Sequence, residues 1–403
     1  MIALPQAWCV VDQRLSPLSP SRLRLLDALH HVLASPVVAD RDIPAVNRSA
    51  MDGYAFSPGR AAAAPLRLVV RGEIPAGTRP AFALGPGECA RIFTGAAVPE
   101  GADTVVMQED TTAEEGGAVR VDEIPARGAN ILKQGENARA GMELIPAGTL
   151  IAAVHIALCA AAGRAHLDVV PKPRVAILTT GEELLDASEE AAPHQIRDSN
   201  GPMISAQLRA AGFAALACRR VRDSEEEIAA VAGSVLKSAD VLLITGGVSV
   251  GKYDLVPAAL QRLGAARHIH GIAVKPGKPQ LFATLGPDKF IFGLPGNPLS
   301  VMVGLHELVL PALRKLSGFP KEALHPALRA TVSELVRGRP DQHHFIPARL
   351  TWTDAGPEVK IVHGHGSADL VSACGANGFV MVPPDAQVEP GGRVEFRPWG
   401  ALP

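Results

Sequence analysis

The sequence predicts a multidomain α/β protein built around a central three-layer domain with a mostly parallel sheet. A length of 403 residues is too great for one ordinary hydrophobic core, which predicts roughly two to four domains. Between residues 173 and 318, apolar segments of strand length alternate with capped helical segments. On either side, short strand-like segments are separated by glycine and proline. These observations together predict an α/β domain flanked by β-rich domains.

The central stretch carries the clearest pattern. Near-continuous apolar runs, typical of strands covered on both faces, occur at 174–178, 213–218, 240–245 and 290–294. Helix start and stop signals follow them: Ser224 with Glu227, Asp254 before a helix reaching Leu263, and Asn297 with Pro298 before a long helix that Gly318 ends. Alternation of this kind predicts parallel strands with helices on both faces of the sheet.

Four domains are expected around this pattern. Residues 19–34 are predicted to form a helix with a face made of Leu25, Leu26, Leu29, Val32 and Leu33. The alanine-rich stretch from 141 onwards is expected to pack back against that helix. The predicted domains are 1–44 with 141–172 (amino-terminal), 45–140 (β-rich insert), 173–318 (α/β) and 319–403 (carboxy-terminal β).

Composition excludes several classes of protein. The formal net charge of -2 gives no electrostatic basis for binding nucleic acid or a membrane surface. The five cysteines form no CxxC pair and support neither a disulfide framework nor a zinc site. The sequence shows no signal peptide and no apolar run of the roughly 20 residues that a membrane helix needs. We therefore expect a soluble protein of the reducing cytoplasm.

The loops after the predicted strands carry the functional candidates, because open α/β sheets bind ligands at the carboxyl ends of their strands. The segment "TTGEELL" places Glu182 and Glu183 at one exit, and Asp223 follows another strand. The remaining candidates lie in "GGVSVGKYD" and "KPGKP", and they are Gly246, Gly247, Ser249, Gly251, Asp254, Lys275 and Lys278.

These loops meet two chemical demands at once. Glycine backbone amides, Ser249 and the two lysines can bind phosphate or another oxyanion. The carboxylates of Glu183, Asp223 and Asp254 can hold Mg²⁺ between phosphate oxygens. Each piece alone also has a structural explanation: a tight turn, a helix cap, a solvated helix start or a surface cation. Their convergence favours a phosphorylated or nucleotide-bearing ligand.

Two polar segments outside the central stretch are also possible functional segments. "NRSAMDGYAF" (47–56) brings together Ser49, Asp52, Gly53 and Tyr54, and "RIFTGAAVPEGADTVVMQED" (91–110) places Thr94 beside Gly95. From the residues alone, both segments are explained by turn chemistry.

The motifs together resemble one family, the MoeA and gephyrin E-domain family of molybdopterin molybdenumtransferases. The resemblance covers nearly the whole chain and keeps the family's order and spacing. The matching segments are "NRSAMDGYA", "RIFTGAAVPEGAD", "TTGEELL", "QIRDSN", "GGVSVGKYD", "KPGKP", "LPGNPLS" and "GSADLVSACGANGF". An ordered set of this size is far more specific than any single glycine loop.

The resemblance implies a homodimer whose subunits contain an amino-terminal domain, a β-rich insert, a molybdopterin-binding α/β domain and a carboxy-terminal β-barrel. It implies an active cleft shared between subunits, which adds Asp52 and Thr94 as site candidates. The implied reaction releases AMP from adenylylated molybdopterin while molybdate joins the dithiolene sulfurs. Molybdopterin adenylyltransferase and recipient molybdoenzymes are the further partners to expect.

The resemblance also suggests roles for the candidates. The "GGVSVG" loop, Asp254, Pro295 and Pro298 would bind the pterin and AMP phosphate, with Mg²⁺ neutralising charge. Lys278, Ser300 and Ser367 are the molybdate candidates, since a tetrahedral dianion needs ammonium and hydroxyl donors. Lys275 and Thr94 complete the catalytic candidates. Asp52, Glu183 and Asp223 would orient the metal, the water or the pterin, with the three roles left unassigned.

Three positions depart from the family pattern. Leu132 stands in a position that is often arginine, Asn137 in one that is often aspartate, and Pro347 in one that is commonly arginine. Arg349 or Lys133 is a possible substitute in space, although neither would reproduce the bidentate geometry of an arginine without movement.

Two alternatives remain beside the insertase. One is adenylylation of molybdopterin by ATP, against which "SAMDGYA" and the terminal β domain argue. The other is a non-catalytic pterin-binding or scaffold protein, which the three departures suggest. Molybdate-dependent release of AMP separates the insertase from both.

Overall fold

The computed structural model describes residues 1–59, 63–248 and 255–400. The chain divides into two compact units. The larger unit comprises Met1–Leu23, His30–Ala34 and Asp168–Pro403, and the smaller comprises Arg24–Leu29 and Ser35–Leu167. No helix in the described ranges is long and apolar enough to cross a membrane. The four domain boundaries drawn from the sequence remain predictions.

The larger unit is organised around a six-stranded sheet in the order β17-β14-β18-β22-β21-β19. Its strands are β14 (Val175–Thr180), β17 (Ala215–Val221), β18 (Val241–Thr245), β19 (Ala266–His270), β21 (Leu281–Leu285) and β22 (Lys289–Leu294). The first four in spatial order run parallel, β21 is antiparallel to β22, and β19 is antiparallel to β21, so that β21 alone is reversed in this sheet. The four strands expected from apolar runs and the mostly parallel sheet are confirmed.

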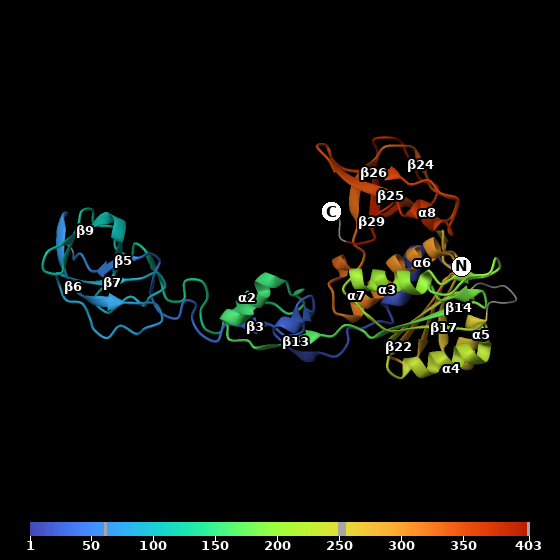
Figure 1. Ribbon diagram of the computed structural model, residues 1–403, viewed down its shortest axis with the longest axis horizontal. Helices are drawn as coiled ribbons and strands as arrows, with labels where there is room; N and C mark the ends of the chain where they lie inside the picture. The colour runs from blue at the N-terminus through green and yellow to red at the C-terminus, as the bar shows by residue number, and fades with distance from the viewer. Residues whose placement is uncertain (60–62, 249–254, 401–403) are drawn as a thin grey trace. The chain divides into compact units, whose positions relative to one another are not determined.

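Helices cover both faces of this sheet (Figure 1), because successive residues of each central strand point to opposite faces. One face packs against α1 (Leu4–Asp12), α3 (Asn200–Ala210), α6 (Pro298–Gly304) and α7 (Leu310–Leu316), and the other against α4 (Glu225–Leu236) and α5 (Val256–Arg262). Val175 and Ile177 belong to the first core, whereas Ala176 and Leu178 belong to the second. The three-layer prediction is confirmed.

The predicted helix signals are confirmed where the structure describes them. The Ser224 side chain accepts a hydrogen bond from the Glu227 backbone amide and begins α4. The long helix begins at Pro298, passes through the π-helical segment Leu305–Val309 and ends at Leu316, two residues before Gly318 at φ 78°. Asp254, the expected cap of α5, lies outside the described residues.

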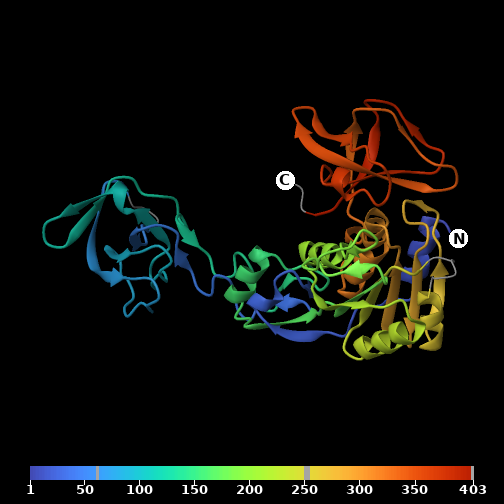
Figure 2. The ribbon, with the colours of Figure 1, turned by 45° about the vertical axis from the view of Figure 1, so that its right-hand side comes forward.

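The carboxy-terminal part of the larger unit is a β-barrel, whose curled strands are visible in Figure 2. Its strands are β23 (Leu328–Val332), β25 (His343–Thr353), β26 (Gly356–Ile361), β27 (Gly378–Val382) and β29 (Arg393–Pro398). Pairing of β25 with both β26 and β27 closes the sheet on itself. A short strand, β20 (Val274–Lys275), adds to β25 in parallel, so a segment of the α/β sequence is bonded directly to the barrel.

Several short elements complete the larger unit. They are the pair β15 (Leu184–Leu185) and β16 (Ile196–Arg197), the pair β24 (Val336–Arg337) and β28 (Gln387–Val388), the 3-10 turn Lys321–Ala323, and α8 (Leu370–Ala373).

The smaller unit contains a second six-stranded sheet, in the order β8-β5-β7-β6-β10-β9. Its strands are β5 (Gly53–Phe56), β6 (Leu66–Ile74), β7 (Glu88–Ile92), β8 (Thr104–Met107), β9 (Thr111–Glu114) and β10 (Ala118–Val121). The 3-10 turn Gln108–Asp110, the paired strands β3 (Val37–Val38) with β12 (Glu143–Ile145) and β4 (Arg48–Ser49) with β11 (Ile131–Leu132), and α2 (Ala153–Ala161) make up the rest. The β-rich character expected for this part of the sequence is confirmed.

The helix predicted for residues 19–34 is wrong. That segment forms β1 (Ser21–Arg24), a 3-10 turn (Leu26–Ala28) and β2 (Val32–Leu33). Both strands share a sheet with β13 (His166–Val170), and His30 adopts φ 61°, which no helix allows. Leu26, assigned to the buried helix face, is 76% exposed. Strand pairing with a segment more than a hundred residues away overrides local helical periodicity. The stretch from 141 onwards therefore returns to the amino-terminal segment through strand pairing and not by packing on a helix.

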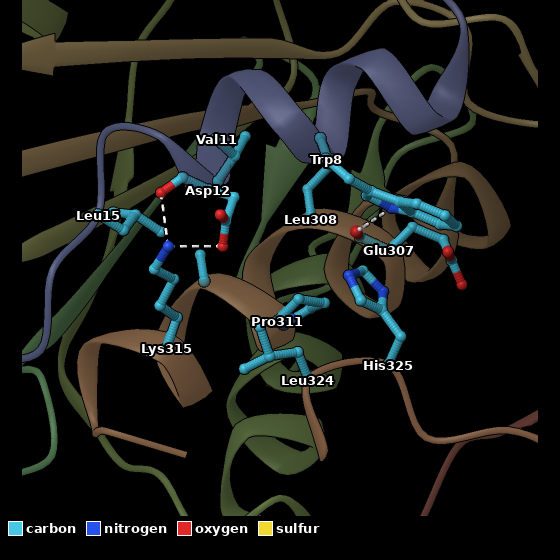
Figure 3. A pocket seen from close by; sticks show the side chains of 11 residues that line it. Trp8, Val11, Asp12, Leu15, Glu307, Leu308, Pro311, Lys315, Leu324 and His325 are labelled. Carbon is cyan, nitrogen blue, oxygen red and sulfur yellow. Dashed lines mark hydrogen bonds and ion pairs between the residues drawn. The ribbon is translucent and has the colours of Figure 1, made fainter. Parts of the chain in front are cut away.

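The amino-terminal helix α1 was not predicted, and it is anchored to the long helix (Figure 3). Trp8 Nε1 donates to the Glu307 carbonyl at 2.9 Å, and Lys315 Nζ reaches the Asp12 carboxylate at 2.6 Å. The amide of Ile2 donates to the Gly271 carbonyl, which fixes the start of the chain beside the sheet. Ionic and hydrogen-bonded anchors therefore hold α1 where its apolar residues are buried.

Beneath α1 lies a group of buried titratable side chains. The carboxylate of Glu307 is 3.5 Å from the Arg397 guanidinium, and both side chains are almost fully buried. Burial raises the pKa of Glu307 to about 7, although the Arg397 charge acts against this. Burial lowers the pKa of His306 to about 3 and that of His325 to about 4. The folded protein therefore prefers all three groups neutral.

We expect the Glu307→Gln variant to gain stability relative to the wild type as pH rises. Because the pKa of Glu307 is raised from 4.5 to about 7 on folding, the folded state binds the extra proton in that window, and the unfolding free energy falls as pH increases through it. The difference between variant and wild type should change by on the order of 3 kcal/mol across the window. Unfolding midpoints measured at matched pH, with exposed Glu322→Gln as the control, test this; a difference that does not vary with pH would contradict it.

Candidate functional site

The four parallel strands end at one edge of the central sheet. Thr180, Val221, Thr245 and Leu294 are the last residues of neighbouring strands. Since parallel strands present their carboxyl ends at the same edge, the loops carrying Glu183, Asp223 and Gly246 are brought to one side of the domain.

The "KPGKP" loop reaches this edge for a different reason from the one expected. Lys275 ends β20, which pairs with the barrel strand β25 and not with the central sheet. The loop then leads into β21, whose first residue Leu281 lies opposite Gly293 near the end of β22. Because β21 is antiparallel to β22, the beginning of β21 and the end of β22 share the same edge.

The glycine loop after β18 lies directly against the end of β14. Gly246 has φ 95°, and a Cβ atom there would overlap the Thr180 carbonyl oxygen and stand 2.8 Å from Thr180 Oγ1. Only glycine satisfies both the positive φ and the close approach. Thr180 Oγ1 is buried and makes no well-formed hydrogen bond among the described residues, although it lies near enough to the Asp223 carboxylate to act against the rise in the pKa of that group. The two strand exits therefore form a tight floor with a buried hydroxyl.

Asn200 ties the same edge together, and sequence reasoning assigned it no role. Its Nδ2 donates to Thr245 Oγ1 at 3.1 Å and to the Gly296 carbonyl at 2.6 Å. Thr245 Oγ1 in turn donates to the carbonyl of Pro295 at 2.8 Å. These bonds fix the exit of β18 to the exit of β22. The signal was available in the motif "QIRDSN", of which Asn200 is the last residue.

A cluster of carboxylates lies at the exits of β14 and β17. Burial raises the pKa of Asp223, and the nearby charge of Glu183 raises it further. The Glu183 side chain folds back over the strand end, since a Cβ on Gly181 would stand 2.8 Å from Glu183 Oε2. Two like charges crowded at a strand exit favour a bound cation. In the described part of the chain, no group of three His, Cys, Asp or Glu side chains is positioned to hold a metal ion.

The turn that carries the two lysines is packed against α6. Gly277 has φ 100°, and a Cβ there would come within 3.1 Å of the Ser300 carbonyl oxygen. Buried Gln280 donates from Nε2 to the Gly277 carbonyl at 2.9 Å. The side chains of Lys275 and Lys278 are exposed on this fixed turn. Ser300, a predicted molybdate ligand, is buried beneath it.

A cavity of about 370 Å³ separates the start of α6 from the barrel. Lys275 and Ser367 line it, whereas Lys278 and Ser300 do not. Ser367 is held in place because its Oγ accepts from Asn297 Nδ2 at 2.9 Å and its carbonyl accepts from the Leu299 amide at 3.0 Å. Pro347 lines the cavity as well, while Arg349 does not. The position commonly occupied by arginine in the family therefore faces this cavity.

The remaining candidates fall into three groups. Ser249, Gly251 and Asp254 lie outside the described residues. Pro298 begins α6, and Pro295 is buried and accepts the Thr245 bond. Asp52 and Thr94 lie in the smaller unit, where they meet.

Asp52 and Thr94 form a compact hydrogen-bonded pair. Asp52 Oδ1 accepts from the Thr94 amide at 2.7 Å and from Thr94 Oγ1 at 2.6 Å, and these bonds hold the pKa of Asp52 below its usual value. The Gly95 amide donates to the carbonyl of Ser49, so the two motifs fold into one structure. The segment carrying Leu132 pairs with Arg48 in the neighbouring strand.

An α/β domain with polar groups gathered at one sheet edge, joined to a β-barrel through a basic cavity, defines a multidomain α/β protein built to bind an anionic ligand. Comparison with known proteins narrows this class. Residues 2–163 match the family described as "MoeA N-terminal region (domain I and II)", 176–315 match "Probable molybdopterin binding domain", and 329–399 match "MoeA C-terminal region (domain IV)".

Full-length relatives agree. The chain is 36% identical over 359 residues to a molybdopterin molybdenumtransferase from Nostoc sp., covering 87% of this chain and 82% of that protein. It is 35% identical over 367 residues to one from Bacillus subtilis, covering 89% and 85%. A crystal structure of a molybdopterin biosynthesis MoeA protein from Pyrococcus horikoshii is similar with a TM-score of 0.85 and 28% identity, covering 100% of both chains. The chain belongs to the MoeA family of molybdopterin molybdenumtransferases, and the resemblance drawn from its motifs is confirmed.

We expect Gly246→Ala to be far more damaging than Gly264→Ala. Both glycines have positive φ, 95° and 85°, but a Cβ on Gly264 would meet nothing within 4 Å. The Gly264 variant should lose about 1 kcal/mol through backbone strain, and the Gly246 variant about 3 kcal/mol or more because Thr180 must also move. Thermal unfolding of both variants measures the difference, and equal losses would show that the close approach at the strand exits is unimportant.

Proposed function

We propose that this protein is the molybdenum insertase of molybdenum cofactor biosynthesis. It takes adenylylated molybdopterin and molybdate and releases molybdenum-bearing molybdopterin and AMP. The proposal rests on the family to which the chain belongs and on one structural observation, the meeting of the β14, β17 and β18 exits. There a glycine loop, a buried threonine hydroxyl and two carboxylates come together.

The residues at this edge have complementary tasks in the proposed reaction. The loop beginning at Gly246 and Gly247 approaches a phosphate closely because it lacks side chains. Lys275 and Lys278 supply positive charge for an oxyanion on the adjoining turn. Asn200 keeps the β18 and β22 exits at a fixed separation while the ligand binds between them. Fixed donors of this kind stabilise developing charge without reorganisation.

Glu183 and Asp223 fit a magnesium ion. Their crowding raises the pKa of Asp223, and a divalent cation would relieve the repulsion that causes the rise. When bound, Mg²⁺ would neutralise phosphate oxygens and so ease cleavage of the bond to AMP. The two carboxylates would hold the ion at the strand exits, and Asp254 is a third candidate ligand on sequence grounds alone.

The proposed setting follows from the family and the composition. We place the enzyme in the cytoplasm as a homodimer, with molybdopterin adenylyltransferase before it and recipient molybdoenzymes after it. The near-neutral net charge supports no role with nucleic acid. Asp52 and Thr94 would then act on the cleft of the partner subunit.

We expect release of AMP from adenylylated molybdopterin to require both molybdate and Mg²⁺. Asp223→Asn and Lys278→Ala should each lower the rate by about 100-fold or more, because each removes a charge that the transition state needs. Exposed Asp288→Asn and Lys237→Ala, which change the same residue types away from the sheet edge, should leave the rate unchanged. The measurement is single-turnover AMP formation.

The same assay separates the alternatives. Consumption of ATP without any need for molybdate would identify an adenylyltransferase instead. Tight binding of the adenylylated pterin with no AMP under any condition would identify a binding protein.

We expect mixed dimers to recover activity lost in two different variants. If Asp52 of one subunit completes the cleft of the other, Asp52→Ala and Asp223→Asn subunits can together form one intact cleft. Random exchange should restore about a quarter of wild-type activity, since half of the dimers are mixed and each has one intact site of two. Mixtures that stay as inactive as the parent variants would place both residues in the same cleft of one subunit.

A further inference from the structure

The cavity between α6 and the barrel has one apolar and one basic wall. Apolar side chains from both parts line it, and they include Leu299, Phe345, Ile346, Pro347, Ile361 and Val362. The basic wall carries Lys275, Arg339 and His344. All of these residues belong to the larger unit, so the cavity is complete within one chain. Of these three basic residues, only Lys275 was predicted from the sequence to be a site residue.

The basic wall lacks a balancing anion. In the ranges that the structure describes, neither Lys275 nor Arg339 forms an ion pair with a carboxylate. Burial lowers the pKa of His344, and the charges of Arg339 and Lys275 lower it further, although a hydrogen bond to the Arg337 carbonyl acts against this. Both cations therefore lie close enough to His344 to repel the charge of its protonated ring. An anion entering the cavity would relieve that repulsion.

The acidic groups at the cavity are already engaged. The Asp369 carboxylate accepts from the Ser372 amide and hydroxyl and from the His365 amide, and so caps α8. Glu334, which does not line the cavity, has Oε2 at 2.9 Å from Nε2 of His363, which does. Among the described residues, neither carboxylate bonds to the basic wall, so the positive groups stay available for a ligand.

Backbone bonds hold the basic residues in position. The Asp385 amide donates to the Arg339 carbonyl, and the preceding Gly338 amide donates to the Ala386 carbonyl at 2.7 Å. His344 Nδ1 donates to the Arg337 carbonyl at 3.2 Å, so Nε2 can donate to a ligand only from the protonated ring, which a bound dianion would favour. Lys275 is paired with His344 through the strands β20 and β25. The wall is therefore preorganised.

We propose that Arg339 and His344 are oxyanion-binding residues of this cavity, and that with Lys275 and Ser367 they bind the tetrahedral dianion that the enzyme consumes. This inference deepens the proposed function and rests on it. Ser367 suits the role because its Oγ accepts from Asn297 and keeps its own proton to donate. Arg339 supplies the guanidinium that Pro347 cannot, and it approaches from the turn before β25.

Calorimetric titration of the intact protein with molybdate tests this directly, using Arg339→Gln, His344→Gln and Arg349→Gln. Arg349 is the matched control, because it lies on the same barrel strand, is exposed and does not line the cavity. Loss of one charged hydrogen-bond donor should weaken molybdate binding by about 10- to 100-fold in the Arg339 variant. His344→Gln should weaken it by a smaller factor, and Arg349→Gln should bind as the wild type does.

AMP release separates this inference from the proposed function. We expect the molybdate concentration for half-maximal release to rise in Arg339→Gln by the same factor as the dissociation constant. Molybdate-dependent release that is identical in Arg339→Gln and wild type would overturn the inference and leave the function intact. Arg339-dependent molybdate binding with no AMP release in the wild type would support the cavity and overturn the function.

Two further arms keep the test decisive. In the Arg339→Gln background, Pro347→Arg should restore molybdate binding, since it returns a guanidinium to the same cavity. An unfolding midpoint close to that of the wild type shows that each variant is folded. Binding of sulfate in place of molybdate, with molybdate itself not bound, would show that the cavity does not serve the substrate oxyanion.

Discussion

The close approach between the end of β14 and the start of the loop after β18 is the constraint on which the site depends. Gly246 must lack a side chain because the Thr180 carbonyl occupies the space that a Cβ would need. This contact sets the spacing of two neighbouring strand exits and leaves backbone exposed where a phosphate can reach it. The Asn200 bridge to Thr245 and Gly296 extends the same rigidity to the β22 exit. A binding edge built from such short contacts needs little reorganisation when its ligand arrives.

The reversed strand β21 connects this edge to the barrel. Because β21 reverses direction beside β22, the turn that precedes it arrives at the edge where the parallel strands end. The same turn begins with β20, which is bonded to β25 of the barrel. The lysine turn is therefore hydrogen-bonded to the barrel through β20, and it continues directly into β21 of the central sheet. This arrangement places a basic cavity beside the sheet edge without any long loop.

The sequence predicted the central sheet well because its signals are local. Apolar runs at 174–178 and 240–245 and the cap at Ser224 depend on neighbouring residues alone, and each appears in the structure. The segment 19–34 misled for the opposite reason. Its leucines repeat with helical spacing, but pairing of Val32 and Leu33 with β13 decides its conformation, and a single sequence does not show that pairing. The helix α1 was not predicted for the same reason, because its position depends on contacts with the distant residues Glu307 and Lys315.

The candidate site also contains residues that the sequence predicted and residues that it did not. Glu183, Asp223 and Gly246 were found because a general rule places ligands at the ends of parallel strands. Arg339 and His344 were not found, because an exposed arginine in a turn and one of two adjacent histidines carry no sequence signal. Only the closed barrel shows that they line one cavity together with Lys275. Pro347 was noticed as a departure from the family, and its position in the wall explains why another residue has to supply the charge.

The most direct test of this account is the position of tungstate, a heavy analogue of molybdate, located by its anomalous scattering in crystals of the protein. The account predicts a single strong peak in the cavity between α6 and the barrel, within hydrogen-bonding distance of Lys275, Arg339 and Ser367. A peak only elsewhere, such as beside Thr94 in the smaller unit, would contradict the claim that the sheet edge and the barrel together form the oxyanion site.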